Sequence, residues 1–338
     1  MNDGQIRQQV HPGAHPPDEE MRAARFWRGM VCFLAIVLAL AASTTAADTR
    51  PKLTPPYRLM YGYKDLAGFK PQPFWSDVKE CDRLWNEVFG RFNIITGKTT
   101  DAAVVKRLRE RGIIFAYSVS NNRNATHKTT EDFVREWSKP LEDTLGGKLP
   151  GGFDAISIDE LHGDTDGSAD SEITINAVRE VRRRFPNKII LTWAPMVVAL
   201  AGSPEKNGLR YAKGKVCDNQ FRMVAECCDL MMVECYQKEG APHFDWFAEA
   251  AKNLDTRAPG LTHKTVFGLC VSQREDLNMD DKPEVNFAQY VEKQFMLLKT
   301  EPLVKQTPGV AIYSFYRAKP EFIPTVNALV EKYYGPLK

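Results

Sequence analysis

Eight short apolar stretches recur along this 338-residue chain, and segments with a helical pattern lie between them. The predicted strands cover residues 58–63, 92–97, 113–119, 155–161, 189–194, 230–236, 265–271 and 309–316. Most are almost continuously hydrophobic, which is typical of parallel strands with one face under helices and the other packed inward. Eight alternations of strand and helix predict an α/β fold, a single (β/α)8 TIM barrel, rather than a doubly wound sheet. No G-x-G-x-x-G motif follows the first strand, so a dinucleotide-binding fold is also disfavoured.

Turn and cap residues mark several of the predicted helices. Thr100 is expected to cap a helix that ends at Gly112, because threonine favours the N-cap and glycine the position after the last turn. Thr130 is expected to cap a helix over residues 131–145, and another helix is predicted near residues 171–185, before a proline.

The first part of the chain has the pattern of a secretory signal peptide. Three arginines precede an apolar run at residues 30–42, and small residues follow as far as Ala47. The run is shorter than the roughly 20 residues that cross a membrane. We therefore expect residues 1–47 to be an N-terminal extension and signal peptide, with Met21 as a possible true start, and residues 48–338 to form the barrel.

This organisation predicts a secreted or periplasmic protein. If the signal peptide is cleaved, no stable membrane partner is expected, and an uncleaved membrane anchor is the alternative. The chain carries 45 basic and 43 acidic side chains, so its charge balance gives no reason to expect a nucleic-acid partner.

Six cysteines lie beyond the predicted signal peptide. An even number in an exported protein allows disulfides, whereas cysteines inside apolar strands are equally compatible with buried free thiols. Their spacing matches no zinc pattern. The six are Cys81, Cys217, Cys227, Cys228, Cys235 and Cys270.

Two carboxylates stand out near the ends of predicted strands, where the active sites of TIM barrels lie. Side chains alternate along a strand, so Ser157 and Asp159 should share one face of the fourth strand and point into the barrel. By the same rule Met232, Glu234 and Tyr236 share a face of the sixth strand. A buried, unpaired carboxylate is costly or has a raised pKa, so each of these acids needs a partner or a function.

Glycoside hydrolysis uses two carboxylates roughly 5–9 Å apart, which side chains from the fourth and sixth strands could reach across the mouth. Glu234 has the more apolar neighbours, so we assign it the general acid/base role and Asp159 the role of nucleophile or electrostatic stabiliser. Glu160 is the competing catalytic candidate, expected to point away from the bore unless the strand ends or bulges there. The structural alternative is an ion pair with an inward-pointing cation: Lys64, Lys98 or Arg274.

Polar and aromatic side chains near the predicted strand ends are expected to bind the substrate, the aromatic ones by stacking on sugar rings. They are Tyr61, Tyr63, Lys98, Asn121, His162, Trp193, Tyr236, Gln237, Arg274 and Tyr316. Packing inside the barrel is the alternative for each aromatic residue. We expect no cofactor and no metal, because the loop at residues 162–170 departs from a calcium loop at its first and last ligand positions.

Two short stretches carry a family resemblance. "GFDAISIDE" on the fourth strand and "VECYQ" on the sixth resemble the endo-α-1,4-polygalactosaminidase family of glycoside hydrolases. That resemblance implies a secreted (β/α)8 barrel with catalytic acids at Asp159 and Glu234. This chain departs from the family in having Glu160 directly after the aspartate, and in the tighter spacing between Glu234 and Cys235.

A second resemblance is to the family 18 chitinase-like barrels, whose strand-four signature ends Asp-x-Glu and whose sixth strand keeps a tyrosine. Tyr236 matches that tyrosine, whereas Glu160 follows Asp159 without the intervening residue, so the acid is out of frame.

The sequence therefore predicts an exported glycoside hydrolase that cleaves a polysaccharide or oligosaccharide by two-carboxylate acid/base catalysis. A non-catalytic carbohydrate-binding barrel is the main alternative, since a fold does not fix a function. A third hypothesis is a metal-dependent hydrolase that uses Asp159, Glu160, His162 and Glu234.

Overall fold

The computed structural model divides the chain into two compact units, Met1–Thr49 and Arg50–Lys338, and everything described below belongs to the second. The described residues are 53–61, 78–79, 82, 85–86, 90–99, 101–121, 128–142, 144–161, 168–200, 218–240, 242–272, 282, 284–313, 318–319 and 321–337. The predicted signal peptide lies outside these ranges and stays a prediction.

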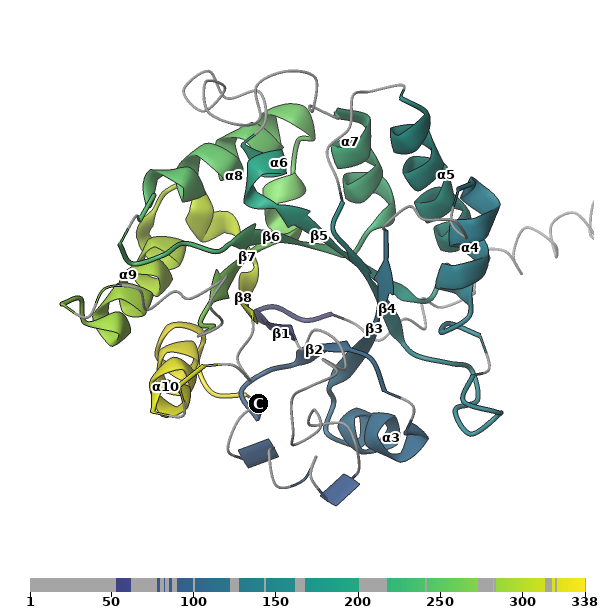
Figure 1. Ribbon diagram of the computed structural model, residues 1–338, viewed down its shortest axis with the longest axis horizontal. Coiled ribbons are helices and arrows are strands. Elements are labelled where there is room, and N and C mark those ends of the chain that lie inside the picture. The colour runs from purple at the N-terminus through teal and green to yellow at the C-terminus, as the bar shows by residue number, and fades with distance from the viewer. Residues whose placement is uncertain are drawn as a thin grey trace, which may run out of the picture. The chain divides into compact units, whose positions relative to one another are not determined.

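Eight parallel strands form a closed barrel in the order β1-β2-β3-β4-β5-β6-β7-β8, which confirms the predicted fold class (Figure 1). The strands are β1 (Tyr57–Tyr61), β2 (Ile94–Gly97), β3 (Ile114–Ser120), β4 (Ala155–Asp159), β5 (Ile189–Pro195), β6 (Leu230–Cys235), β7 (Thr265–Cys270) and β8 (Gly309–Tyr313). Each lies within one of the predicted apolar stretches or extends one residue beyond it.

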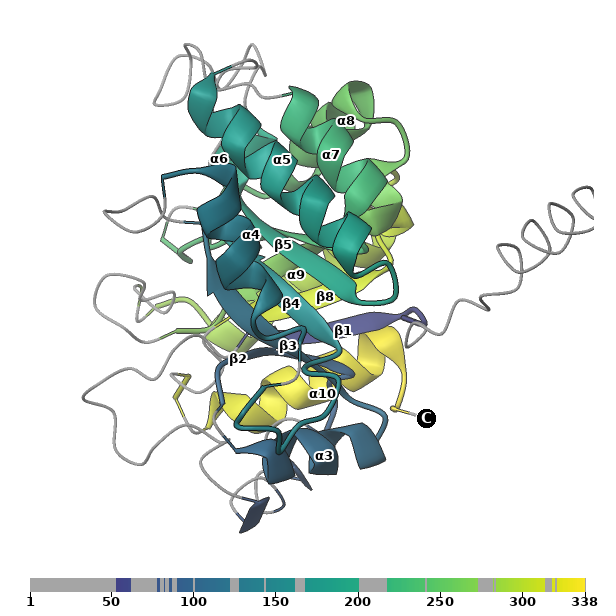
Figure 2. The same ribbon diagram turned by 90° about the vertical axis from the view of Figure 1, so that its right-hand side faces the viewer.

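Helices surround the strands on the outside of the barrel (Figures 1 and 2). The α-helices are α3 (Ala102–Glu110), α4 (Thr130–Ser138), α5 (Ala169–Arg184), α6 (Met196–Ala199), α7 (Asp218–Cys227), α8 (Asp245–Arg257), α9 (Phe287–Thr300) and α10 (Phe322–Tyr334), and short 3₁₀ helices are η2 (Leu261–Lys264) and η4 (Val304–Gln306). None of the helices in the described part of the chain combines the length and the hydrophobicity that a membrane crossing requires.

Two predicted helix caps were wrong by one residue. Asp101 caps α3, because its side chain accepts a hydrogen bond from the Ala103 backbone N–H. Thr129 caps α4 and forms a capping box with Asp132, so Thr130 is the first residue of the helix. That helix ends at Ser138 rather than at Leu145, which has a left-handed backbone with φ of 57°.

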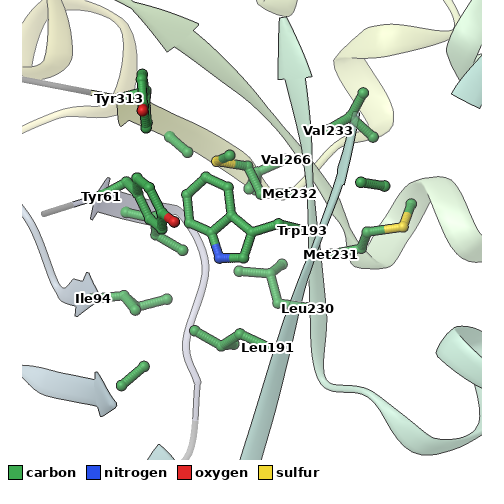
Figure 3. Packing of buried hydrophobic residues seen from close by; sticks show 14 of the residues in the cluster. Tyr61, Ile94, Leu191, Trp193, Leu230, Met231, Met232, Val233, Val266 and Tyr313 are labelled. Carbon is green, nitrogen blue, oxygen red and sulfur yellow. The ribbon is translucent and has the colours of Figure 1, made fainter. Parts of the chain in front are cut away.

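Register places alternate side chains of each strand inside the barrel. Figure 3 shows Trp193 and Met232 on the inner side, while Met231 and Val233 lie on the opposite side of β6. Trp193 and Met232 are register neighbours, and Gly268 on β7 gives the Met232 side chain its room: a Cβ at Gly268 would lie 2.6 Å from the methionine sulfur. The barrel interior is therefore a packed core at this level, with the mouth above it.

Four of the six predicted mature cysteines lie within the described residues, and all four are free thiols: Cys227, Cys228, Cys235 and Cys270. For these four, the structure selects the free-thiol alternative. Cys81 and Cys217 lie outside the described residues.

Candidate active site

Two contacts inside the barrel fix the orientation of β4, the strand that carries Asp159. The Tyr61 hydroxyl, at the end of β1, donates a hydrogen bond of 2.7 Å to Asp159 Oδ1. Ser157 lies two residues before Asp159 on the same face of β4, and its Oγ accepts a hydrogen bond of 2.5 Å from the Trp193 indole Nε1. Because β1 and β4 are not neighbours in the sheet, the first bond crosses the interior of the barrel. The Asp159 carboxylate therefore faces the inside at the carboxyl end of its strand, as the alternation predicts.

Four aromatic rings, Tyr61, Trp193, Tyr236 and Tyr313, form a connected layer inside the barrel, which we call the aromatic layer. Ring centroids lie 3.8 Å apart between Tyr61 and Trp193, 5.2 Å between Tyr61 and Tyr313, and 4.4 Å between Tyr236 and Tyr313. Figure 3 shows Trp193 beside Tyr61, with Tyr313 above them. Stacked and tilted rings of this kind rigidify the region that holds the Tyr61–Asp159 bond.

Trp193 differs from its expected role. Its side chain is fully buried, with 0% exposure, and it lies between Tyr61 and Met232. In this conformation it has no free face on which a sugar could stack, so barrel packing, the alternative considered above, describes it. Tyr61 is also buried, and its hydroxyl is used to hold Asp159.

Glu234 is the residue with the most informative electrostatics in the mouth. Burial raises the pKa of its carboxyl group to about 8, with the negative charges of Glu160 and then Asp159 as further causes. Tyr236, the first residue after β6, is close enough to offset part of this increase in pKa. Glu234 is therefore protonated at neutral pH, which is the state that a general acid needs.

The alternative of a structural ion pair finds no support among the described cations. No lysine, arginine or histidine in the described part of the chain contributes to the pKa of Glu234. Lys98, one of the three cations proposed for such a pair, is half-buried at the end of β2. The other two, Lys64 and Arg274, lie outside the described residues.

Glu160 meets the exception stated above for its orientation, because the strand ends before this residue. Strand β4 ends at Asp159, and Glu160 takes a left-handed backbone with φ of 51°. Alternation no longer applies beyond this point, and among the charges that raise the pKa of Glu234, that of Glu160 has the largest effect. A positive φ in a residue other than glycine costs about 1–3 kcal/mol and is found preferentially at functional sites.

Asn121 holds the chain where this turn occurs. Its Nδ2 donates to the Glu160 carbonyl at 3.1 Å, and its Oδ1 accepts from the Thr174 hydroxyl at 3.2 Å. The next amide along, Leu161 N, donates to the Trp193 carbonyl at 2.6 Å. The buried Asn121 side chain thus positions the Glu160 backbone, and its expected contact with substrate has no support in these bonds.

The Gln237 side chain likewise forms its hydrogen bonds within the segment that follows β6. Its Nε2 donates to Cys235 Sγ and to the His243 carbonyl, and its Oε1 accepts from the His243 amide at 2.7 Å. Both N–H donors are in use, so the amide braces the loop after β6 rather than presenting a donor to a ligand. These bonds give no support to the expectation that Gln237 binds substrate, which stays a prediction.

Four of the predicted substrate residues, Tyr63, His162, Arg274 and Tyr316, lie outside the described residues, and their roles stay predictions. Within the described residues, no group of three or more His, Cys, Asp and Glu side chains is arranged to hold a metal ion. The third hypothesis also needs His162, so the described residues alone do not provide its ligand set.

The sequence reasoning missed Tyr313. It faces inward at the end of β8, in register with Tyr61 on β1, and connects Tyr61 to Tyr236. The signal was present: alternation from Gly309 and Ala311 places Tyr313 on the inner face. The predicted strand runs on to residue 316, which places Tyr316 rather than Tyr313 at its end.

The raised pKa of Glu234 predicts how stability changes with pH. Below about pH 4.5 the carboxyl group is protonated in both the folded and the unfolded chain, so its ionisation does not change the free energy of unfolding. Between pH 4.5 and about 8 only the unfolded chain ionises at this position, which favours unfolding. Relative to Glu234→Gln, the wild-type protein should lose stability on the order of 5 kcal/mol across this range. Urea unfolding at several pH values measures the difference.

Glu226→Gln is the matched control, because the Glu226 side chain is 58% exposed and paired with Arg179 on the surface. Its stability relative to the wild type should vary little over the same pH range. A wild-type protein that gains stability over Glu234→Gln with rising pH would show that Glu234 is ionised and paired.

No protein-family model matches this sequence, and no curated protein matches it either. Solved structures do share its fold. A chitinase from Bacteroides thetaiotaomicron superposes with a TM-score of 0.54 at 12% identity, covering 82% of this chain and 97% of that one. The C-terminal domain of Legionella pneumophila ChiA gives 0.53 at 12%, covering 82% and 98%.

A family GH18 chitinase from Chromobacterium violaceum gives a TM-score of 0.52 at 13% identity, covering 85% of this chain and 86% of that one. At these identities the likeness concerns the fold. The chain is a closed eight-stranded barrel of the kind found in chitinases and related glycoside hydrolases.

Proposed function

We propose that this protein is an exported glycoside hydrolase that cleaves a polysaccharide at the carboxyl end of the barrel. The observation that carries the proposal is a partly accessible glutamic acid, Glu234, held protonated near neutral pH beside two further carboxylates. Titratable groups whose pKa values are driven apart in a cleft mark acid/base sites. The chitinase fold of the neighbours and the predicted signal peptide support the same conclusion.

Each carboxylate has a proposed role. Glu234 donates its proton to the glycosidic oxygen as the bond breaks, and afterwards accepts a proton from water. Asp159, which accepts a hydrogen bond from Tyr61, serves as the nucleophile or stabilises the positive charge that develops on the sugar. The charge of Glu160 helps to keep Glu234 protonated, which is a supporting role for the residue that was the competing catalytic candidate.

The proposed substrate class comes from the solved structures that share this fold. Two of the neighbours described above, from Bacteroides thetaiotaomicron and Chromobacterium violaceum, are chitinases, so a carbohydrate substrate is the first to test. Hydrolysis of amino-sugar and neutral polysaccharides by the purified protein should appear as new reducing ends, and these should be absent with Glu234→Gln. Chelation with EDTA should leave the activity unchanged.

Three results would redirect the proposal. Sugar binding without any turnover, retained in both Asp159→Asn and Glu234→Gln, would indicate the carbohydrate-binding barrel. Activity that EDTA removes and a divalent metal restores would indicate the metal-dependent hydrolase. Turnover that survives both substitutions would remove the assignment of these two acids.

A further inference from the structure

A cavity of about 460 Å³ lies at the opposite end of the barrel from the acids. Residues from the segment before β1, the starts of β1, β2 and β3, and the end of α10 line it. Its size falls within the range of small-molecule sites. Because strands begin at this end and the candidate acids lie where they finish, the cavity is separate from the mouth of the barrel.

Arg58, the second residue of β1, is the polar group that makes this cavity unusual. Its side chain is 4% exposed, and Nη2 donates to the Tyr334 carbonyl at 2.8 Å and the Pro336 carbonyl at 3.1 Å. Nε and Nη1 are buried without a hydrogen-bond partner. A guanidinium has five N–H donors, so three of them are unpartnered in a buried position. Leaving charged donors in that state costs several kcal/mol, which a bound acceptor would remove.

The charges around the cavity point to the same kind of ligand. Arg111 also lines it, and its Nη1 is buried without a partner while Nη2 pairs with Asp82. Among the described residues that line the cavity there is no aspartate or glutamate. The acid that acts on the Arg58 charge from outside, Glu331, pairs with Arg91 at 2.8 Å. The described lining therefore contains two arginines, of which Arg111 is already paired with Asp82, and no acid.

The rest of the lining is mostly apolar, with Leu53, three prolines, three isoleucines and Leu337. Asn93, the polar amide in the wall, already bonds the Arg58 amide and the Pro56 carbonyl. We propose that this cavity binds an oxyanion, a phosphate or carboxylate group on a small molecule with an apolar body, through Arg58 and with Arg111 as the second positive charge. Burial lowers the pKa of the Arg58 guanidinium, which is the direction expected for a cation that lacks its counterion.

This inference is independent of the proposed hydrolase activity. The purified full chain is titrated with inorganic phosphate, and separately with acetate, by calorimetry at constant ionic strength. Saturable binding at one site is expected. Arg58→Lys keeps the charge and loses the planar fork, and it should weaken binding by about tenfold or more. Arg182→Lys is the matched control, because the Arg182 side chain is 18% exposed, lies outside the cavity lining and bonds Asp229, Cys227 and Lys188.

Arg58 also caps α10, so the substituted protein could fail to fold, and a second measurement uses the unmodified chain. Crystals grown with selenate should show anomalous selenium density within hydrogen-bond distance of Arg58 Nε or Nη1. Selenate bound elsewhere, or an adventitious ion only, would overturn the proposal. So would the absence of saturable binding for both probes, or equal affinity in the wild type and in folded Arg58→Lys.

Discussion

Glu234→Gln should lower kcat/KM on the cleaved polysaccharide by about a thousandfold while the protein stays folded. A positioned general acid contributes about 10²–10⁴ to a rate, and glutamine cannot donate a proton to the leaving oxygen. The pKa of about 8 means that the wild-type residue holds its proton through the neutral range, so the loss should be seen at pH 7 and below. Steady-state kinetics on a soluble oligosaccharide measure it, with circular dichroism to confirm the fold.

Two controls make this prediction specific. Glu226→Gln makes the same chemical change at an exposed surface ion pair and should leave kcat/KM near the wild-type value. A substrate with an activated leaving group, which needs no proton, should recover most of the activity of Glu234→Gln but not that of Asp159→Asn. Equal loss on both substrates would contradict the role of Glu234 as the acid.

Asp159→Asn should cause a loss of similar size, about a thousandfold or more, for a different reason. The amide keeps the shape of the carboxylate but lacks the negative charge that attacks or stabilises the sugar carbon. Removing that charge also lowers the pKa of Glu234, because Asp159 is one of the charges that raise it. The basic limb of the residual pH–rate profile should therefore move to lower pH.

Tyr61→Phe separates the position of Asp159 from its charge. It removes the 2.7 Å hydrogen bond and keeps the ring that stacks with Tyr313 and Trp193. One hydrogen bond to a charged group corresponds to roughly tenfold in rate, so the loss should lie well short of that in Asp159→Asn. Full activity of Asp159→Asn would contradict the assignment of Asp159. So would a loss of activity in Tyr61→Phe as large as the loss in Asp159→Asn.

The fold could be predicted from the sequence because its signals are local and repeated. Eight apolar runs with helices between them leave few topologies, and alternation alone places Ser157, Asp159 and Glu234 on inner faces. For Ser157 and Asp159 the structure bears this out through two bonds that no local pattern encodes: Tyr61 to Asp159 and Trp193 to Ser157.

What the sequence could not give depends on backbone turns and long-range partners. Glu160, just after β4, reaches the mouth because its backbone takes a left-handed turn. Asn121, just after β3, holds that turn by a hydrogen bond, and no local pattern links the two residues. Gln237 looks like a ligand-binding amide until the fold of its loop brings His243 back to it. From the sequence, Trp193 near a strand end is equally compatible with stacking on a sugar and with packing in the core. Only the positions of Tyr61 and Met232, which cover its ring, decide between the two roles.

The proposed catalysis depends most on Glu234 holding a proton at neutral pH in a mouth that it shares with other carboxylates. Carbon-13 NMR of the protein labelled at glutamate side-chain carboxyls measures this directly, with the Glu234 resonance assigned by its absence from Glu234→Gln. A titration midpoint near pH 8, moving lower in Glu160→Gln, is the predicted result. A midpoint near the ordinary value of 4.5, unchanged by that substitution, would contradict it.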